Sequence, residues 1–197
     1  MKIIAVAGGS GCGKSLFAHY LQERLPKSNI IALDNFYQER PDHIPMEKYN
    51  FDIPSAFDFK LFHQALEDLS EGVPAHIPMY EYGTGKRKRT TTKLIPGEFL
   101  IIEGLYVLMS PSLRGSLTYS FYLESPPDVA LGRRILRDHQ ERTADVEYTL
   151  NQYFTFVRPA YYTHILPTKQ YANMVIENDI KSRLDLFLDD FFSKYTF

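Results

Sequence analysis

The stretch IIAVAGGSGCGKS, residues 3–15, joins a short apolar run to a glycine-rich segment. Five consecutive apolar residues, Ile3 to Ala7, predict a strand buried on both faces, as the strands of a parallel sheet are. The glycines that follow end this strand, and a helix-like segment, Leu16–Leu25, comes next. The stretch therefore predicts a strand, a loop and a helix in immediate succession.

The loop of this unit fits the pattern G-x-x-x-x-G-K-[ST] in full. Glycines at these positions let several backbone N–H groups converge on one phosphate, at a helix N-terminus that already favours anions. In this pattern Lys14 reaches the β- and γ-phosphates, and the Ser15 hydroxyl binds Mg²⁺. The residues predicted to bind a nucleoside triphosphate are Gly8, Gly9, Ser10, Gly11, Cys12, Gly13, Lys14 and Ser15.

Similar apolar runs recur along the chain, with helical patterns between them. This alternation predicts a doubly wound α/β fold with a five-stranded, mostly parallel sheet and helices on both faces. The further predicted strands are Ile30–Leu33, Phe99–Ile102, Phe121–Leu123 and Met174–Ile176. The helical patterns include Leu61–Leu69 after an Asp58 cap, and a final stripe of Leu184, Phe187, Leu188, Phe191 and Phe192.

Residues 73–95 depart from this alternation. They are rich in β-type residues and contain the turn-prone sequence Gly83-Thr84-Gly85. We expect an antiparallel hairpin here, added to the sheet.

Composition limits the class of protein. The 197 residues are 44% apolar, which suits one domain spanning residues 1–197. Lys and Arg number 22 against 24 Asp and Glu, so the net charge of −2 argues against nucleic-acid and membrane-surface binders. Cys12 is the single cysteine, which excludes an internal disulfide. The first apolar run is too short for a secretory signal, and no run approaches the roughly 18 residues of a membrane span. We expect a cytoplasmic protein.

Two acidic residues stand at predicted strand ends. Asp34 follows Ile30–Leu33, and Glu103 follows Phe99–Ile102. Ligands of open α/β sheets bind beyond the carboxyl ends of strands, so both acids are expected to face the phosphate loop. There Asp34 can accept a proton from a substrate hydroxyl, and Glu103 can hold Mg²⁺ directly or through water. The alternative is a solvated acid at the start of a loop.

Arginines mark the helix-like segment Pro127–Gln140. Three of them fall within an arc of roughly 100°, opposite Leu131, Ile135 and Leu136. An ordinary amphipathic surface helix has the same pattern. The polar stretch Asp138–Glu147 is a candidate lid, and arginines on a closing lid can stabilise a phosphoryl group in transfer. The arginines concerned are Arg133, Arg134 and Arg137, with Arg142 just beyond.

The loop alone does not distinguish among phosphate-binding proteins. The GTPase patterns D-x-x-G and N-K-x-D do not occur in the sequence. Their absence argues against a GTPase switch. A nucleotide-binding regulator without transferase activity stays as an alternative to an enzyme.

Eight blocks, in order, resemble the uridine (uridine-cytidine) kinases of the phosphoribulokinase/uridine kinase family. The resemblance implies the P-loop NTPase fold and phosphorylation of the 5′-hydroxyl of uridine or cytidine, a reaction of pyrimidine salvage. It implies ATP or GTP as donor, Mg²⁺ as cofactor, and a homo-oligomer, a tetramer. The blocks are Gly8–Ser15, Leu33–Tyr37, Asn50–Asp58, Ile77–Tyr80, Ile101–Gly104, Arg133–Asp138, Gln152–Pro159 and Pro167–Ala172.

The resemblance also implies roles for single residues. Asp34 matches the base for the nucleoside 5′-hydroxyl, Asp52 matches a residue that holds ribose hydroxyls, and Tyr80 matches one that contacts the pyrimidine. Gln152 matches a substrate-side residue. The arginines that match residues lining the substrate and the lid are Arg134, Arg137 and Arg142.

Two positions depart from the family pattern. The family has a second base-reading residue, a histidine, where this chain has Gly85, and its lid reads Arg-Gly-Arg where this chain has Arg142-Thr143-Ala144. A site with fewer base-reading groups discriminates its base less strongly. Other acceptors therefore stay open: nicotinamide riboside, a sugar phosphate, pantothenate or glycerate. The basic run Lys86–Arg89 is either a solvated hairpin tip or a source of cations for an anionic substrate.

Overall fold

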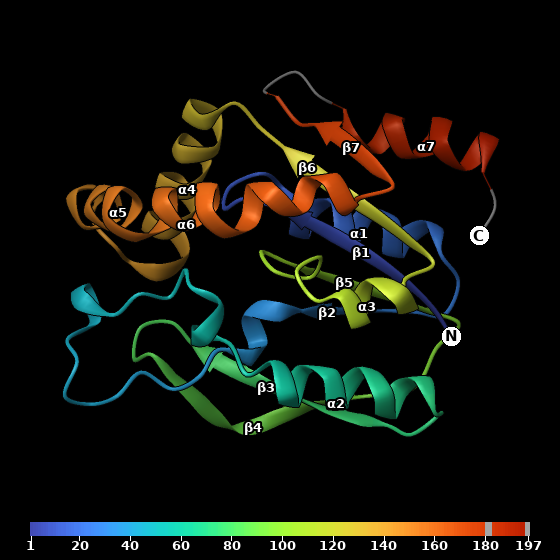
Figure 1. The fold of residues 1–197 in the computed structure, drawn as a ribbon, viewed down its shortest axis with the longest axis horizontal. Helices are drawn as coiled ribbons and strands as arrows, with labels where there is room; N and C mark the ends of the chain where they lie inside the picture. The colour runs from blue at the N-terminus through green and yellow to red at the C-terminus, as the bar shows by residue number, and fades with distance from the viewer. Residues whose placement is uncertain (180–182, 196–197) are drawn as a thin grey trace.

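A sheet of five parallel strands forms the centre of the structure, a computed structural model that describes residues 1–179 and 183–195 (Figure 1). The strand order is β2-β5-β1-β6-β7, and every neighbouring pair is parallel, which confirms the predicted α/β sheet. The strands are β1 (Lys2–Gly8), β2 (Ser28–Ala32), β5 (Phe99–Gly104), β6 (Tyr119–Glu124) and β7 (Met174–Glu177).

The sheet separates two hydrophobic cores. Successive residues of a strand point to opposite faces, so Ile3 and Ala5 of β1 join one core while Ile4 and Val6 join the other. Helices α2 (Phe59–Ser70) and α3 (Pro111–Ser116) cover the Ile3 face. Helices α1 (Lys14–Arg24) and α7 (Leu184–Lys194) cover the Ile4 face. The predicted helices on both faces are confirmed.

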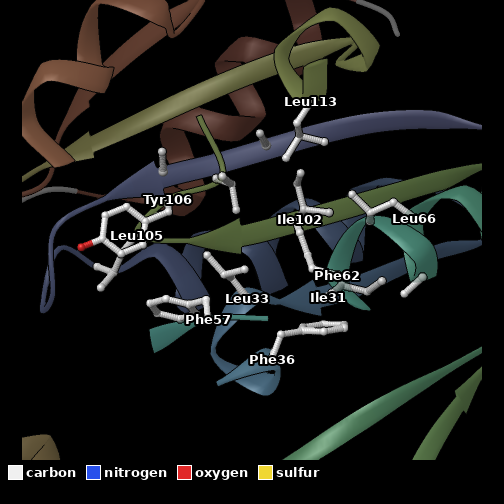
Figure 2. Packing of buried hydrophobic residues seen from close by; sticks show 14 of the residues in the cluster. Ile31, Leu33, Phe36, Phe57, Phe62, Leu66, Ile102, Leu105, Tyr106 and Leu113 are labelled. Atoms are coloured by element: carbon white, nitrogen blue, oxygen red, sulfur yellow. The ribbon is translucent and has the colours of Figure 1, made fainter. Parts of the chain in front are cut away.

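Figure 2 shows the core on the α2 face. Phe36 and Phe62 pack edge to face, with ring centroids 5.2 Å apart, below Ile102 of β5. Helix α2 begins after Asp58, whose side chain accepts a hydrogen bond from the Leu61 N–H, as predicted. This cap satisfies one of the N–H groups that a helix leaves unpaired at its N-terminus.

The turn after β2 differs from the prediction. Leu33, expected in the strand, begins a 3-10 turn, Leu33–Phe36. Residues three apart share one face of such a turn, so Leu33 and Phe36 are buried together in the core. The turn carries Asp34 away from the strand. On the neighbouring strand, β5 runs on to Gly104, so Glu103 lies within the strand rather than after it.

Strands β3 (Ala75–Glu81) and β4 (Lys86–Leu94) form the predicted antiparallel hairpin. The hairpin is a separate two-stranded sheet, which corrects the expectation that it extends the central one. It is attached through side chains: Ala75 and Ile77 enter the core, and the Asn35 side chain donates a hydrogen bond of 2.9 Å to the Pro78 carbonyl. The backbone groups of β3 pair with β4 instead of with the edge strand β2.

The remaining helices follow one another between β6 and β7. Helices α4, α5 and α6 lie at the same end of the molecule as the carboxyl ends of β1 and β6 (Figure 1). No helix among residues 1–179 and 183–195 is long and apolar enough to span a membrane. The elements are α4 (Pro127–Arg142), α5 (Val146–Gln152), a π-helix (Tyr153–Val157), α6 (Arg158–Ala160), a second π-helix (Tyr161–Ile165) and a 3-10 helix (Leu166–Tyr171). Two further 3-10 turns precede α2, at Met46–Lys48 and Pro54–Ala56.

Candidate active site

A cavity of about 360 Å³ lies at the carboxyl ends of the central strands, within the size range of small-ligand sites. Several of the surrounding elements contribute residues singled out from the sequence. The loop after β1 brings Lys14 and Ser15, the turn after β2 brings Asp34, and β5 brings Glu103. The lining also includes Ser10, Asp52, Arg134, Arg137, Arg142 and Gln152.

The glycine-rich loop, Gly8–Ser15, needs its glycines for backbone conformation and for space. Gly11 and Gly13 have φ angles of 80° and 88°, a left-handed conformation that other residues rarely adopt. The Lys14 ammonium donates a hydrogen bond of 2.9 Å to the Gly9 carbonyl, which holds the lysine across the loop. Helix α1 starts at Lys14, so its unpaired N–H groups and this cation meet at the cavity.

Gly11→Ala is expected to destabilise the loop. A methyl group at Gly11 would lie 2.1 Å from the Ala130 carbonyl oxygen, and its left-handed backbone alone costs about 1–2 kcal/mol for alanine. We expect urea denaturation to show a loss of at least that size. Gly132 provides the control, because nothing lies within 4 Å of its added methyl group in the middle of α4. Gly132→Ala should gain about 0.5–1 kcal/mol. Equal stability of the two variants would contradict this description of the loop.

Ser15 and Glu103 form the cavity's oxygen-rich pair. The Ser15 hydroxyl donates a hydrogen bond of 2.8 Å to the Glu103 carboxylate. Glu103 is 8% exposed, and burial raises the pKa of its carboxyl above the ordinary value. A hydroxyl and a carboxylate are hard oxygen donors of the kind that Mg²⁺ accepts together with substrate phosphates. These two residues therefore fit the predicted metal site.

Asp34 faces the cavity beside a residue that sequence reasoning missed. The Tyr82 hydroxyl, from the turn of the hairpin, donates a hydrogen bond of 3.2 Å to the Asp34 carboxylate. The Arg142 guanidinium stacks on the Tyr82 ring, 3.9 Å from its centroid. Burial and the nearby Asp34 charge raise the pKa of the Tyr82 hydroxyl, so it stays a donor at neutral pH. No local signal marks Tyr82, because it lies in the turn just after β3 and meets Asp34 only through the fold.

Helix α4 turns its charged side inward. Asp138 is its buried residue, whereas Leu136 on the predicted apolar side is 61% exposed. This arrangement is the reverse of an ordinary amphipathic surface helix. Arg134, Arg137 and Arg142 line the cavity, but Arg133 does not. Arg133 instead donates to the Asn178 carbonyl behind the loop, which corrects the grouping of all four arginines.

Asp138 holds the three cavity arginines together. Its carboxylate lies 2.8 Å from Arg137, 3.3 Å from Arg134 and 3.5 Å from Arg142. One buried anion thereby reduces the mutual repulsion of three guanidinium groups. Arg134 also donates a hydrogen bond of 2.8 Å to the Ser10 hydroxyl, which connects the cluster to the glycine-rich loop.

The cavity lining also includes two buried residues matched to the substrate side, Asp52 and Gln152. Asp52 is 6% exposed, and burial raises the pKa of its carboxyl, with Arg134 opposing that effect. The Gln152 side chain is also buried and donates to the Glu47 carbonyl at 2.8 Å. Both line the cavity together with Asp34. The structure thus places a buried acid and a buried amide in the same cavity as the phosphate loop.

The hairpin contributes less to the cavity than expected. Tyr80 is not among the lining residues; its ring packs beside Tyr37, with centroids 5.2 Å apart. Gly85 is buried and outside the cavity, and a methyl group there would lie 3.1 Å from the Arg40 Cβ. Arg40 therefore fills the space beside the position where the family has its histidine. Among the described residues of the hairpin, Tyr82 and Gly83 line the cavity.

The basic run Lys86–Arg89 lies in β4 rather than at the tip of the hairpin. The Lys86 ammonium pairs with Asp42 at 2.7 Å. The Arg87 guanidinium donates to the Tyr37 carbonyl and pairs with Asp58, so it binds the hairpin to the start of α2. None of the run lines the cavity. The solvated-tip interpretation is wrong for Arg87, which is partly buried.

A glycine-rich loop at a helix N-terminus, a carboxylate and three arginines around one cavity are the features of a P-loop phosphotransferase site. Residues 3–183 match the model of the Phosphoribulokinase / Uridine kinase family, and the chain belongs to this family. The chain is therefore an ATP-dependent kinase.

Relatives support this assignment. The uridine kinase of Borrelia hermsii is 34% identical over 177 residues, which cover 89% of this chain and 86% of the relative. The uridine-cytidine kinase 2-B of Danio rerio is 35% identical over 187 residues, covering 88% and 72%. The structure of phosphoribulokinase from Rhodobacter spheroides has a TM-score of 0.66 at 14% identity, covering 93% of this chain and 72% of that one. The last likeness supports the fold.

Proposed function

We propose that this kinase transfers the γ-phosphoryl group of ATP to the 5′-hydroxyl of uridine or cytidine. The observation that carries the proposal is the shared cavity, which Asp34 lines together with Lys14 and Ser15 of the loop. The family and the names of the curated relatives support the nucleoside class. Pyrimidine salvage, a cytoplasmic location and a tetramer are part of this proposal by family resemblance.

The donor side is assigned to the loop. Its N–H groups and Lys14 hold the triphosphate, at the positively polarised start of α1. Ser15 and Glu103 would hold Mg²⁺, which supplies positive charge to the β- and γ-phosphates when bound. ATP is the donor that the family implies, and GTP is the alternative.

The acceptor side is assigned to Asp34 and the arginines. Asp34 takes the proton of the acceptor hydroxyl. The oxygen of that hydroxyl forms a bond to the γ-phosphorus, and the bond between the γ-phosphorus and the bridging oxygen of ADP breaks. The acceptor hydroxyl replaces the Tyr82 hydroxyl at this carboxylate. Arg134, Arg137 and Arg142 stabilise the charge on the transferring group. Residues 138–147 act as the lid, with a bend at Thr143, whose φ is 52°.

Asp52→Asn is expected to raise stability and to weaken acceptor binding. Burial raises the pKa of Asp52 above its ordinary 3.8, so the folded state binds more protons and its stability falls as pH rises above that value. The amide removes this penalty. We expect a higher Tm at pH 7 and a gain that vanishes below pH 3.8. The KM for uridine should rise about tenfold or more as ribose contacts are lost. An unchanged KM would remove Asp52 from the acceptor site.

A second candidate changes the acceptor. Gly85 stands where the family has a base-reading histidine, and Arg40 fills the space beside it. Ala144 stands where the family has a second lid arginine. Another small alcohol is therefore an alternative acceptor. An acceptor panel tests both: uridine, cytidine, nicotinamide riboside, pantothenate, glycerate and a sugar phosphate, assayed by ADP release. Turnover with uridine or cytidine supports the proposal. Turnover confined to another acceptor establishes the second candidate, and the absence of acceptor-dependent ADP with all of these compounds would contradict both candidates.

A further inference from the structure

Asn178 lies buried behind the glycine-rich loop, just after β7. Its side-chain amide donates a hydrogen bond of 2.9 Å to the Cys12 carbonyl, and the residue is 5% exposed. Its own backbone N–H donates to the Glu124 carbonyl at 2.7 Å. The backbone of Asn178 is therefore anchored to the end of β6 while its side chain holds the loop.

A second set of contacts fixes the backbone of Asn178. Its carbonyl accepts hydrogen bonds from the Ser125 hydroxyl at 2.7 Å and from the Arg133 guanidinium at 3.0 Å. Arg133 also donates to the Asp179 carbonyl at 3.0 Å. These bonds connect α4 and the end of β6 to the backbone just after β7. Arg133, which does not reach the cavity, is part of this support.

The amide acts on a peptide whose direction matters for phosphate binding. The Cys12–Gly13 peptide is trans, so the Gly13 N–H points opposite to the Cys12 carbonyl. With that carbonyl bound to Asn178, the Gly13 N–H points away from Asn178. A methyl group at Gly13 would lie 2.5 Å from the Asn178 amide nitrogen, so the amide packs closely on one side of the loop.

We propose that Asn178 is a positioning residue that keeps the Cys12 carbonyl turned away from the nucleotide and the Gly13 N–H turned toward its phosphates. Without the amide donor, rotation of this peptide would place a carbonyl oxygen where phosphate oxygens must bind, and like partial charges would repel. The inference rests on ATP binding to the loop and is independent of the acceptor.

Asn178→Asp tests the inference because the carboxylate has the amide's shape but cannot donate. Asn178→Ala is the second variant. Asn173 offers a matched control: it precedes β7 at the opposite end of the strand, and its side chain accepts hydrogen bonds from the backbone N–H and hydroxyl of Ser120. Titration calorimetry with ADP and Mg²⁺ is run on the wild type and every variant, at a temperature well below the lowest Tm among them. KM is measured for ATP and for the acceptor.

Both Asn178 variants are expected to bind ADP about tenfold more weakly, with a matching rise in the KM for ATP and an unchanged KM for the acceptor. Asn173→Ala is expected to keep the ADP affinity even where its Tm falls. Unchanged ADP affinity in Asn178→Asp, or an equal loss in Asn173→Ala, would overturn the inference. A wild-type chain that binds ADP but phosphorylates no nucleoside would refute the proposed acceptor and leave this test intact.

Discussion

Lys14→Met is expected to lower kcat by about 10²–10³-fold or more. The Lys14 ammonium already lies across the glycine-rich loop, 2.9 Å from the Gly9 carbonyl, and it is the loop's own charged side chain in the cavity. In the proposed reaction Lys14 stabilises charge that develops on the phosphates, and preorganised donors of this kind carry effects of that size. Initial rates of ADP release at saturating ATP and acceptor measure the change.

Lys27 provides the matched control. Its ammonium pairs with Glu98 at 2.6 Å, but both side chains are more than half exposed and neither lines the cavity. Exposed pairs of this kind contribute about 0–1 kcal/mol to stability. Lys27→Met should therefore keep the wild-type kcat. If Lys14→Met retained more than about a tenth of the wild-type kcat, well outside the expected range, its role at the phosphates would be wrong.

Asp34→Asn is expected to lower kcat by about 10²–10⁴-fold with little change in the KM for ATP. The amide keeps the shape of the side chain but cannot take the proton of the acceptor hydroxyl. Asp34 stands on a turn fixed by the buried side chains of Leu33 and Phe36, so the substitution leaves the fold in place. Steady-state kinetics with each substrate varied in turn measure this separation.

Two variants distinguish proton transfer from other effects at Asp34. Asp42→Asn removes an exposed carboxylate that pairs with Lys86 away from the cavity, and it should leave kcat unchanged. Tyr82→Phe removes the hydroxyl that donates to Asp34 but keeps the carboxylate, so its effect should stay below about tenfold. Near-normal turnover in Asp34→Asn would eliminate Asp34 as the proton acceptor.

The parts of the fold that the sequence predicts are those with strong local signals. A strand buried on both faces must be almost wholly apolar, which marks Ile3–Ala7 and Phe99–Ile102. The glycines of the loop indicate its conformation, because Gly11 and Gly13 adopt left-handed backbones that other residues rarely take. Asp34 and Glu103 follow from the same signals, since parallel strands bring their carboxyl ends to one edge.

Other parts depend on contacts between distant segments, which local patterns do not encode. Tyr82 contacts Asp34 across 48 positions of sequence. Arg133 and Arg134 are adjacent on α4, yet Arg133 binds the Asn178 carbonyl behind the glycine-rich loop and Arg134 binds Ser10 within the loop. The inward charged face of α4 has the same spacing as an outward one, so periodicity alone could not orient it. Asp138 gains its importance only because three arginines converge on it.

The sequence patterns predict no helix between α4 and β7, and the cause is physical. It contains Pro159 and Pro167, which remove backbone donors and normally end helices. In the structure two π-helical turns, Tyr153–Val157 and Tyr161–Ile165, stand on either side of α6. Aromatic residues such as Phe154 lie exposed there, so the segment lacks a clear apolar stripe.

Phosphorylation of uridine compared with 5′-deoxyuridine tests the central claim most directly. The two compounds share base and ribose contacts, and only uridine carries the hydroxyl from which Asp34 is proposed to take a proton. With ATP and Mg²⁺, ADP release and phosphorus NMR should show stoichiometric ADP and uridine 5′-monophosphate from uridine, and no acceptor-dependent ADP from 5′-deoxyuridine. Equal ADP release with both compounds, or none with uridine and cytidine, would contradict the account.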